Sequence, residues 1–338
     1  MTNTNVVTAP RHSGVRRSLP ALGLFFLSPL VAEFLLGNIP ISAFYAILTL
    51  APLYGGGAVL IRELVRRQGW GYPSVIVLAL AYGVIEEGIT TQSLFNPNYA
   101  DLRLLDPGHI SALGMGAPWT VFVLGLHTVW SITVPIVLME SVSRRPREPW
   151  LGKIGLWVYG MLFLAGIAAT TAFGYTKDSF RASTGQNIGV GIAIVVLVAL
   201  AVWIGRRTHR RTAGSAPTAG SVPSAWIIGV VTLVLGSGWM VVNDQIKNGW
   251  LEAILLLAIE VLTVFVIVTW SRRTGWTRLH TLAAAGGALL TYAWHAFPET
   301  PVFDAPRSTD LIGNAVFALL AVALLISATI TCDKFGDS

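Results

Sequence analysis

Long apolar runs separated by short polar breaks dominate the pattern of hydrophobic and polar positions along this chain. A bilayer core about 30 Å thick needs about 20 apolar residues to be crossed by one helix. The sequence offers ten such runs, near 19–37, 41–61, 73–93, 118–140, 151–173, 186–205, 225–242, 250–270, 277–297 and 311–331. The pattern therefore predicts an all-α, polytopic membrane protein with about ten transmembrane helices.

Composition supports this prediction and excludes a soluble enzyme. Of the 338 residues, 54% are hydrophobic and 12% are charged, whereas about 25% are charged in an ordinary soluble domain. The mean hydropathy of +0.65 means that a water-borne fold would leave far more apolar surface than one core can hide. The lipid bilayer is therefore the expected partner of this chain.

Basic residues gather in every second predicted loop. Of the 23 Lys and Arg residues, 18 lie on one side of the predicted membrane, and these include Arg62, Arg66 and Arg67 after the second run. The other five are Arg103, Lys177, Arg181, Lys247 and Arg307. An excess of basic residues marks cytoplasmic loops, which predicts cytoplasmic termini and a multi-pass location in a bacterial-type plasma membrane. The net charge of +6 is explained by this placement, and no nucleic-acid partner is expected.

One segment interrupts the series of helices. Residues 212–224 are rich in Ala, Gly, Ser, Thr and Pro, a composition typical of flexible linkers. We expect a cytoplasmic linker there, which divides the chain into a six-helix membrane segment over 1–211 and a four-helix membrane segment over 225–338.

Ionisable side chains inside the predicted spans are few. Each costs free energy in lipid unless it faces a partner, the bundle interior or water, so each is a candidate for function. They are Glu33 in the first run, Glu86 and Glu87 in the third, His127 in the fourth, Glu252 and Glu260 in the eighth, and His295 in the ninth.

Depth separates these residues from one another. With a helical rise of about 1.5 Å per residue, Glu86 lies about 10 Å and His127 about 14 Å below the outer ends of their helices. Glu33 and His295 lie within a turn of theirs. We therefore predict a site in the outer half of the membrane with Glu86, Glu87, His127 and His295 as candidate catalytic residues.

The third run contains two adjacent ionisable residues. Glu86 and Glu87 point about 100° apart on a helix, so one carboxylate can face a cavity while the other supports it, an arrangement suited to general acid and base work. The alternative is that the acids and His127 only hydrogen-bond neighbouring helices as packing contacts, and that His295 is simply solvated at the interface. Residues 93–117 form either a cap over the cavity or an inert connector. The candidate substrate rim consists of Tyr82, Thr91, Asn96, Asn98 and Glu33.

Paired glutamates followed by helices with histidines resemble the CAAX-protease and bacteriocin-processing (CPBP/Abi) family of intramembrane proteases. That family carries E-E-x-x-x-R, F-x-x-x-H and H-x-x-x-N/D. The counterparts here are Glu86-Glu87 with Thr91 in place of Arg, Phe122 to His127 with one extra residue, and His295 with Glu299 in place of Asn or Asp. The resemblance covers the third, fourth and ninth runs. It implies a water activated by Glu86 or Glu87 that attacks a peptide bond, with the histidines holding the water or the oxyanion.

The leading hypothesis is therefore a glutamate-type intramembrane hydrolase, acting on a membrane peptide or small-molecule substrate. The second is a proton-coupled transporter or permease that uses the same carboxylates, and the third is a scaffold in a membrane complex. Motifs for nucleotide, for a zinc protease helix and for prenyl diphosphate are absent from the sequence, so no cofactor is expected. Metal dependence is left open, because three ligands on three helices of uncertain depth would form a site of low specificity.

Overall fold

Helices form almost all of the computed structural model, which describes residues 14–211 and 218–335. In chain order the elements are α1 (Gly14–Pro29), η1 (Leu30–Phe34), η2 (Ile41–Ala46), α2 (Ile47–Arg67), α3 (Tyr72–Ile85), η3 (Glu86–Thr90), η4 (Tyr99–Asp101), β1 (His109–Ile110), β2 (Met115–Gly116), α4 (Ala117–Leu126), η5 (His127–Thr133), α5 (Val134–Val142), α6 (Lys153–Lys177), α7 (Thr184–Arg211), β3 (Thr218–Ser221), α8 (Ala225–Gln245), α9 (Gly249–Ser271), β4 (Arg273–Thr274), α10 (Arg278–His295) and α11 (Arg307–Phe335).

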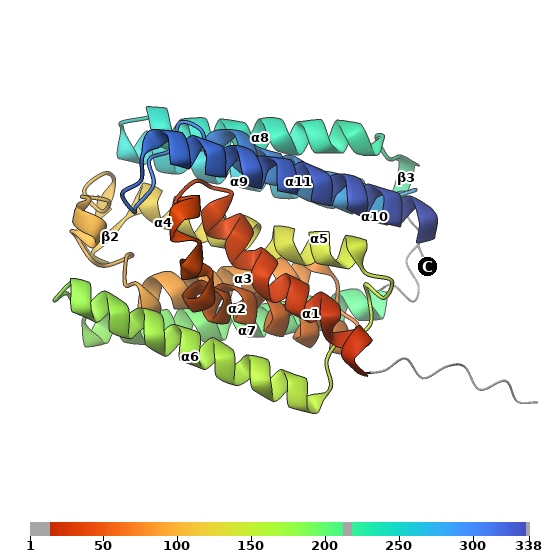
Figure 1. The fold of residues 1–338 in the computed structure, drawn as a ribbon, viewed down its shortest axis with the longest axis horizontal. Helices are drawn as coiled ribbons and strands as arrows, with labels where there is room; N and C mark the ends of the chain where they lie inside the picture. The colour runs from red at the N-terminus through yellow and green to blue at the C-terminus, as the bar shows by residue number, and fades with distance from the viewer. Residues whose placement is uncertain (1–13, 212–217, 336–338) are drawn as a thin grey trace, which may run out of the picture.

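The predicted all-α, polytopic architecture is confirmed. Within the described ranges, nine helical stretches are long and apolar enough to cross a membrane. The ninth predicted run forms α10, which carries histidines and an arginine near its ends and falls outside that set. The described chain starts α1 and ends α11 at the same end of the bundle (Figure 1), as an even number of crossings requires.

The helices form a layered bundle (Figure 1). Helices α8 to α11 lie along one side, where α10 packs against α8, α11 and α5. Helices α6 and α7 lie along the opposite side, and they pack against α2 and α3, respectively. The segment from α4 through α5 therefore lies between the two outer layers, and the candidate His127 is in its middle.

Glycines allow the close approach of α2 to its neighbours. A Cβ atom on Gly57 would lie 2.6 Å from Cε2 of the Tyr82 ring, and one on Gly166 of α6 would lie 2.5 Å from the backbone nitrogen of Leu53. Small residues let membrane helices pack at such short range. Gly57 matters for the site, because a larger residue would displace the Tyr82 ring.

The arginines at the end of α2 correct one detail of the sequence analysis. Helix α2 continues to Arg67, and Arg62, predicted to lie in a loop, is fully buried. Its Nη1 lies 2.7 Å from Glu63 Oε1 and its Nε lies 3.0 Å from Glu140 Oε1. Arg66 Nη2 lies 2.6 Å from Glu140 Oε2, which also accepts a hydrogen bond from Tyr72 Oη at 2.7 Å. The physical reason is that Glu63 and Glu140 neutralise the arginines, so the helix keeps them inside the protein.

The short strands lie at opposite ends of the bundle. Strands β1 and β2 form an antiparallel pair in the connection between η3 and α4. Strand β3 pairs in parallel with β4, so the part of the predicted linker at 218–221 is hydrogen-bonded to the α9–α10 connection. Residues 212–217 of that linker lie outside the described residues.

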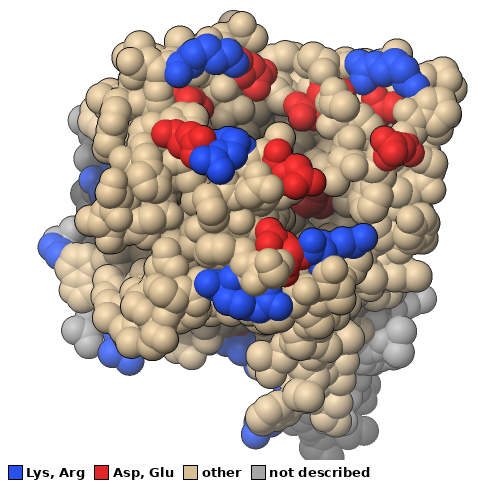
Figure 2. All heavy atoms as spheres, turned by 90° about the vertical axis from the view of Figure 1, so that its left-hand side faces the viewer, with Lys and Arg blue, Asp and Glu red and all other residues tan. Residues whose placement is uncertain are grey.

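Acidic and basic side chains are interspersed on the end of the bundle that carries β1 and β2 (Figure 2). Among them, Arg103 Nε lies 2.9 Å from Asp106 Oδ2 and Arg307 Nη1 lies 2.6 Å from Asp310 Oδ2. This is the end that the basic-residue pattern predicts to face away from the cytoplasm.

Candidate functional site

The candidate residues in the membrane interior lie in helical segments with a widened, π-type turn. Glu33 lies in η1, Glu86 and Glu87 lie in η3, and His127 begins η5. In η3 the backbone N–H of Thr91 donates to the carbonyl of Glu86, five residues back, at 2.8 Å. Single π turns inside α-helices occur frequently at functional sites, because the extra residue re-aims side chains that a regular helix would bury in packing.

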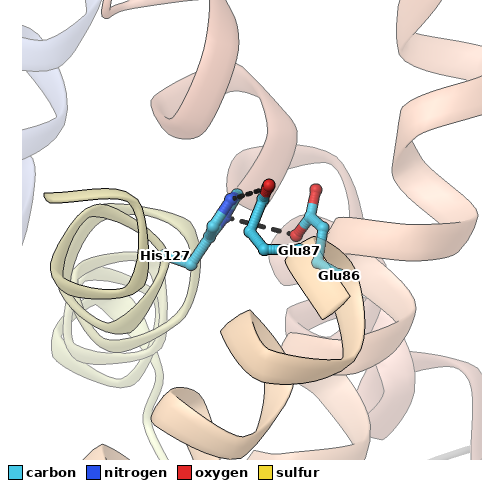
Figure 3. A group of neighbouring side chains, drawn as sticks. All are labelled: Glu86, Glu87 and His127. Carbon is cyan, nitrogen blue, oxygen red and sulfur yellow. Dashed lines mark hydrogen bonds and ion pairs between the residues drawn. The ribbon is translucent and has the colours of Figure 1, made fainter. Parts of the chain in front are cut away.

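The ring of His127 contacts both glutamates (Figure 3). Its Nε2 lies 2.8 Å from Glu87 Oε1, and its Nδ1 lies 3.2 Å from Glu86 Oε2. Nδ1 also lies 3.0 Å from the hydroxyl of Ser131, one turn further along η5. All three ionisable side chains are at least nine-tenths buried. The depth estimates placed Glu86 and His127 in one layer, and these distances agree with them.

Glu87 is held by a complete set of hydrogen bonds. Its Oε1 faces the histidine, and its Oε2 accepts hydrogen bonds from Thr91 Oγ1 at 2.9 Å and from the hydroxyl of Ser93. The Ser93 hydroxyl in turn accepts a hydrogen bond from Trp119 Nε1 at 3.1 Å. This carboxylate is therefore fixed in place and fixes the imidazole ring.

Glu86 differs from its neighbour. Its Oε2 is close to His127 but outside hydrogen-bonding geometry, so among the residues described this buried oxygen has no hydrogen-bond partner. The buried Oη of Tyr82, one helical turn earlier, also lacks one. Buried polar groups are paired in most proteins. The Glu86 carboxylate and the Tyr82 hydroxyl lie next to each other, so a water molecule or a substrate placed between them could hydrogen-bond to both.

Aromatic rings frame the histidine. The ring centroids of Tyr54 and Tyr82 lie 5.9 and 6.1 Å from that of His127. Tyr54 Oη donates a hydrogen bond to Glu33 Oε1 at 2.5 Å, and Asn38 Nδ2 donates to Glu33 Oε2 at 2.5 Å. Glu33 is therefore connected to the site through Tyr54. Glu33 was predicted to lie at the substrate rim, whereas in the structure it lies behind Tyr54.

The connection after η3 contacts the site through Ser93 and is hydrogen-bonded to the neighbouring helices. Gln92 has a φ of 57°, a left-handed conformation that turns the chain sharply at the helix end. Its side chain donates to Tyr175 Oη at 3.0 Å and accepts from the backbone N–H of Ala182 at 3.0 Å. Asn96 Nδ2 donates to Asp178 Oδ2 at 2.5 Å. Residues 92–96 are thereby attached to the α6–α7 connection.

Tyr99 lies in the same covering segment. Burial raises the pKa of its phenol, and the carboxylates of Glu87, Glu33 and Glu86 raise it further. Tyr99 therefore belongs to the surroundings of the three acids, in the connection between η3 and α4.

The contact between Asn96 and Asp178 gives a pH-dependent prediction. The hydrogen bond from Asn96 holds the pKa of Asp178 below its ordinary value of 3.8. A depressed pKa in the folded protein stabilises the contact above the ordinary value and stops doing so as the pH falls through the lowered one. We expect a spin label at Ser179 to become more mobile below about pH 3.8, and Asp178→Asn to abolish that pH dependence. A label equally mobile from pH 6 to pH 3 in the unaltered chain would contradict the prediction.

His295 lies in a different group of side chains. It ends α10, where its Nε2 lies 3.0 Å from Asp244 Oδ2 and its Nδ1 lies 3.7 Å from Glu299 Oε2. Burial raises the pKa of the Glu299 carboxyl. The expectation that His295 meets the other three candidates is therefore corrected. The stacked rings of Trp130 and Tyr292, 4.5 Å apart, fill the contact between η5 and α10.

The other predicted rim residues have distinct positions. Tyr82 belongs to the site itself, and Thr91 holds Glu87. Asn96 is buried against Asp178, whereas Asn98 is exposed and donates to Asp101 Oδ1 at 3.2 Å.

Sequence reasoning missed Tyr54, Ser93 and Trp119 as members of the site. Ser93 follows the end of the helix, and a left-handed turn at Gln92 brings it back to Glu87. Such turns usually contain a glycine, and this one does not, so the sequence carried no signal for it. Tyr54 directly precedes the three glycines of α2. Those glycines, which permit close helix packing, were the only sequence signal that this part of α2 is buried.

Glu86, Glu87 and His127 are also the group that could hold a metal ion. One ligand atom from each lies within 4.8 Å of the other two, and no other such group occurs among the residues the structure describes.

Comparison with known proteins gives the family. The family model described as "Uncharacterized membrane protein family" matches residues 22–335. The chain belongs to this family. The match supports a membrane protein, in agreement with the helices, and gives no support to the resemblance to the CPBP/Abi proteases. Comparisons with curated proteins and with solved structures gave no match.

Proposed function

We propose that this membrane protein is an intramembrane hydrolase in which Glu86 activates a water molecule for attack on a peptide bond. The observation that carries the proposal is the difference between the two glutamates: Glu87 is saturated with hydrogen bonds, whereas the buried Oε2 of Glu86 has none. A general base needs a carboxylate oxygen that is free to accept a proton from water.

The surrounding groups suit the remaining steps. Glu86 takes a proton from water while the water oxygen bonds to the carbonyl carbon. The open Oη of Tyr82 is a donor for the developing oxyanion. When the carbon–nitrogen bond breaks, Glu86 returns the proton to the leaving amine. Glu87 and Ser131 fix the His127 ring beside Glu86, so the ring keeps the carboxylate in position.

The direct test is isotope incorporation. We expect the purified full chain in lipid nanodiscs to cleave members of a library of quenched fluorescent apolar peptides. In ¹⁸O-labelled water the new carboxyl terminus should carry the label, detected by mass spectrometry. The absence of cleavage across the library, in a chain shown to be folded, would contradict the proposal.

The transporter hypothesis predicts a different result for the same carboxylates. A proton-coupled carrier would give pH-dependent flux in proteoliposomes and no labelled peptide product. The arginine–glutamate network around Glu140 closes the opposite end of the bundle with paired, buried charges, which favours a site reached from one side and therefore the hydrolase.

A further inference from the structure

We infer that Glu86, Glu87 and His127 form a binding site for a divalent first-row transition metal ion. This inference rests on the proposed function only for the role that the ion would have there. The binding site itself is argued from the positions of the three side chains and of the groups behind them.

The first argument is the geometry of the donors. Metal bonds to imidazole nitrogen and carboxylate oxygen are about 2.0–2.2 Å long, so two ligands on one ion lie about 3–3.5 Å apart. His127 Nε2 lies 2.8 Å from Glu87 Oε1, and one ligand atom from Glu86 lies within 4.8 Å of one from each of the other two residues. Small side-chain adjustments would bring all three atoms onto a single ion.

The second argument is independent of that clustering. Glu86 is 2% exposed, and its Oε2 has no hydrogen-bond partner among the described residues. A buried carboxylate oxygen without a donor is costly. A cation bound by the Glu86 carboxylate would offset that cost, and two buried carboxylates next to one imidazole supply more negative charge than the ring alone can neutralise.

The third argument is the support behind the ligands. Residues that bind a metal usually have their remaining polar atoms held by other groups. The Glu87 oxygen that faces away from His127 is held by Thr91 and Ser93. The hydroxyl of Ser131 lies 3.0 Å from His127 Nδ1 and can either donate or accept. When it accepts from Nδ1–H, the lone pair of Nε2 is available to the ion.

The donor set also selects the kind of ion. Imidazole suits zinc and the other first-row transition metals, whereas magnesium and calcium prefer sites made of oxygen alone. One nitrogen and two carboxylates leave coordination positions for water. In the proposed hydrolase the ion would polarise that water beside the Glu86 carboxylate.

Cobalt(II) is a suitable probe, because its visible absorption reports coordination by the protein. The full chain should carry a purification tag without histidines and be stripped with chelator in detergent before titration. We expect a Co²⁺ absorption band that one equivalent of Zn²⁺ displaces and that a large excess of Mg²⁺ leaves in place. The band should be lost in Glu87→Gln and in His127→Ala.

Matched variants separate this site from others. His295→Ala removes the other buried histidine with acidic neighbours, and we expect it to leave the band unchanged. Ser131→Ala keeps all three ligands, and we expect it to weaken Co²⁺ binding about 10- to 100-fold. The Ser131 variant keeps the test decisive if a ligand variant fails to fold.

Two results would overturn the inference: no band in the folded, unaltered chain, or a band that persists in both ligand variants. Hydrolysis distinguishes this failure from that of the proposed function. Peptide cleavage by a folded chain that gives no Co²⁺ band would refute the metal site and leave the hydrolase standing. Metal binding that depends on Glu87 and His127, in a folded chain that cleaves no peptide, would support the metal site and refute the hydrolase.

Discussion

Glu86→Gln is expected to lower peptide hydrolysis by about 10²- to 10⁴-fold, the usual contribution of a positioned general base. The substitution keeps the size and shape of the side chain and removes the group that accepts the proton. The substitution removes the charge that faces His127 Nδ1 at 3.2 Å, so the fold of the variant has to be measured alongside its activity. The measurement is the rate of product formation in nanodiscs, with the thermal unfolding midpoint of the same preparation.

Glu260→Gln is the matched control. Glu260 is also a glutamate inside a membrane span whose Oε1 is buried without a hydrogen-bond partner in the described part of the chain. It lies on α9 next to Gly125 and Trp239, and the ion pairs of His127 among the described residues go to Glu86 and Glu87. We expect its substitution to leave hydrolysis unchanged. Equal losses in the two variants would indicate a general effect of removing a buried acid and would contradict a specific role for Glu86.

The sequence predicted the helices and the shared depth of Glu86 and His127, because both depend only on the length of each apolar run and the helical rise. Each apolar run had to be about one bilayer thick, so the positions of Glu86 and His127 could be counted from the helix ends. Their meeting in the structure, at 3.2 Å, required only that the two helices be neighbours. The connection of 25 residues between them made that arrangement the simplest one.

The direction in which a side chain points around its helix could not be predicted in the same way. His295 lies at a suitable depth, yet α10 packs through Tyr292 onto Trp130 and brings its histidine to Asp244. Depth depends on the chain itself, whereas direction depends on which helices pack together. The π turns at Glu86 and His127 change that direction further, and no simple residue pattern marks them.

The buried arginines show a second limit of local reasoning. Counting Arg62 and Arg66 as loop residues gave them the wrong environment, because both side chains lie inside the protein. Their partner Glu140 lies 78 and 74 residues further along the chain, and sequence periodicity carries no information on such a pair. A charge in a span can therefore signal a partner in another helix as well as a functional site.

Glu140→Ala is expected to destabilise the folded protein by about 3–5 kcal/mol, the usual cost of removing one partner of a buried ion pair. The carboxylate of Glu140 binds both Arg62 and Arg66 and accepts a hydrogen bond from Tyr72. Its loss leaves two guanidinium groups in the protein interior with fewer partners. The measurement is the free energy of unfolding in a mild detergent, obtained from denaturant titration followed by circular dichroism.

Glu148→Ala provides the comparison, because the same residue type is removed from an exposed pair. Glu148 Oε2 lies 3.4 Å from Arg145 Nη1, and its side chain is 56% exposed, so water and salt already screen the charges. We expect a change below about 1 kcal/mol there. If Glu140→Ala lowered the free energy of unfolding by less than about 1 kcal/mol, Arg62 and Arg66 would have to reach water or another acid. That result would contradict a structural role for the network at this end of the bundle. A large loss at Glu140 alone would show that paired charges, and not apolar packing only, hold α2 to α5.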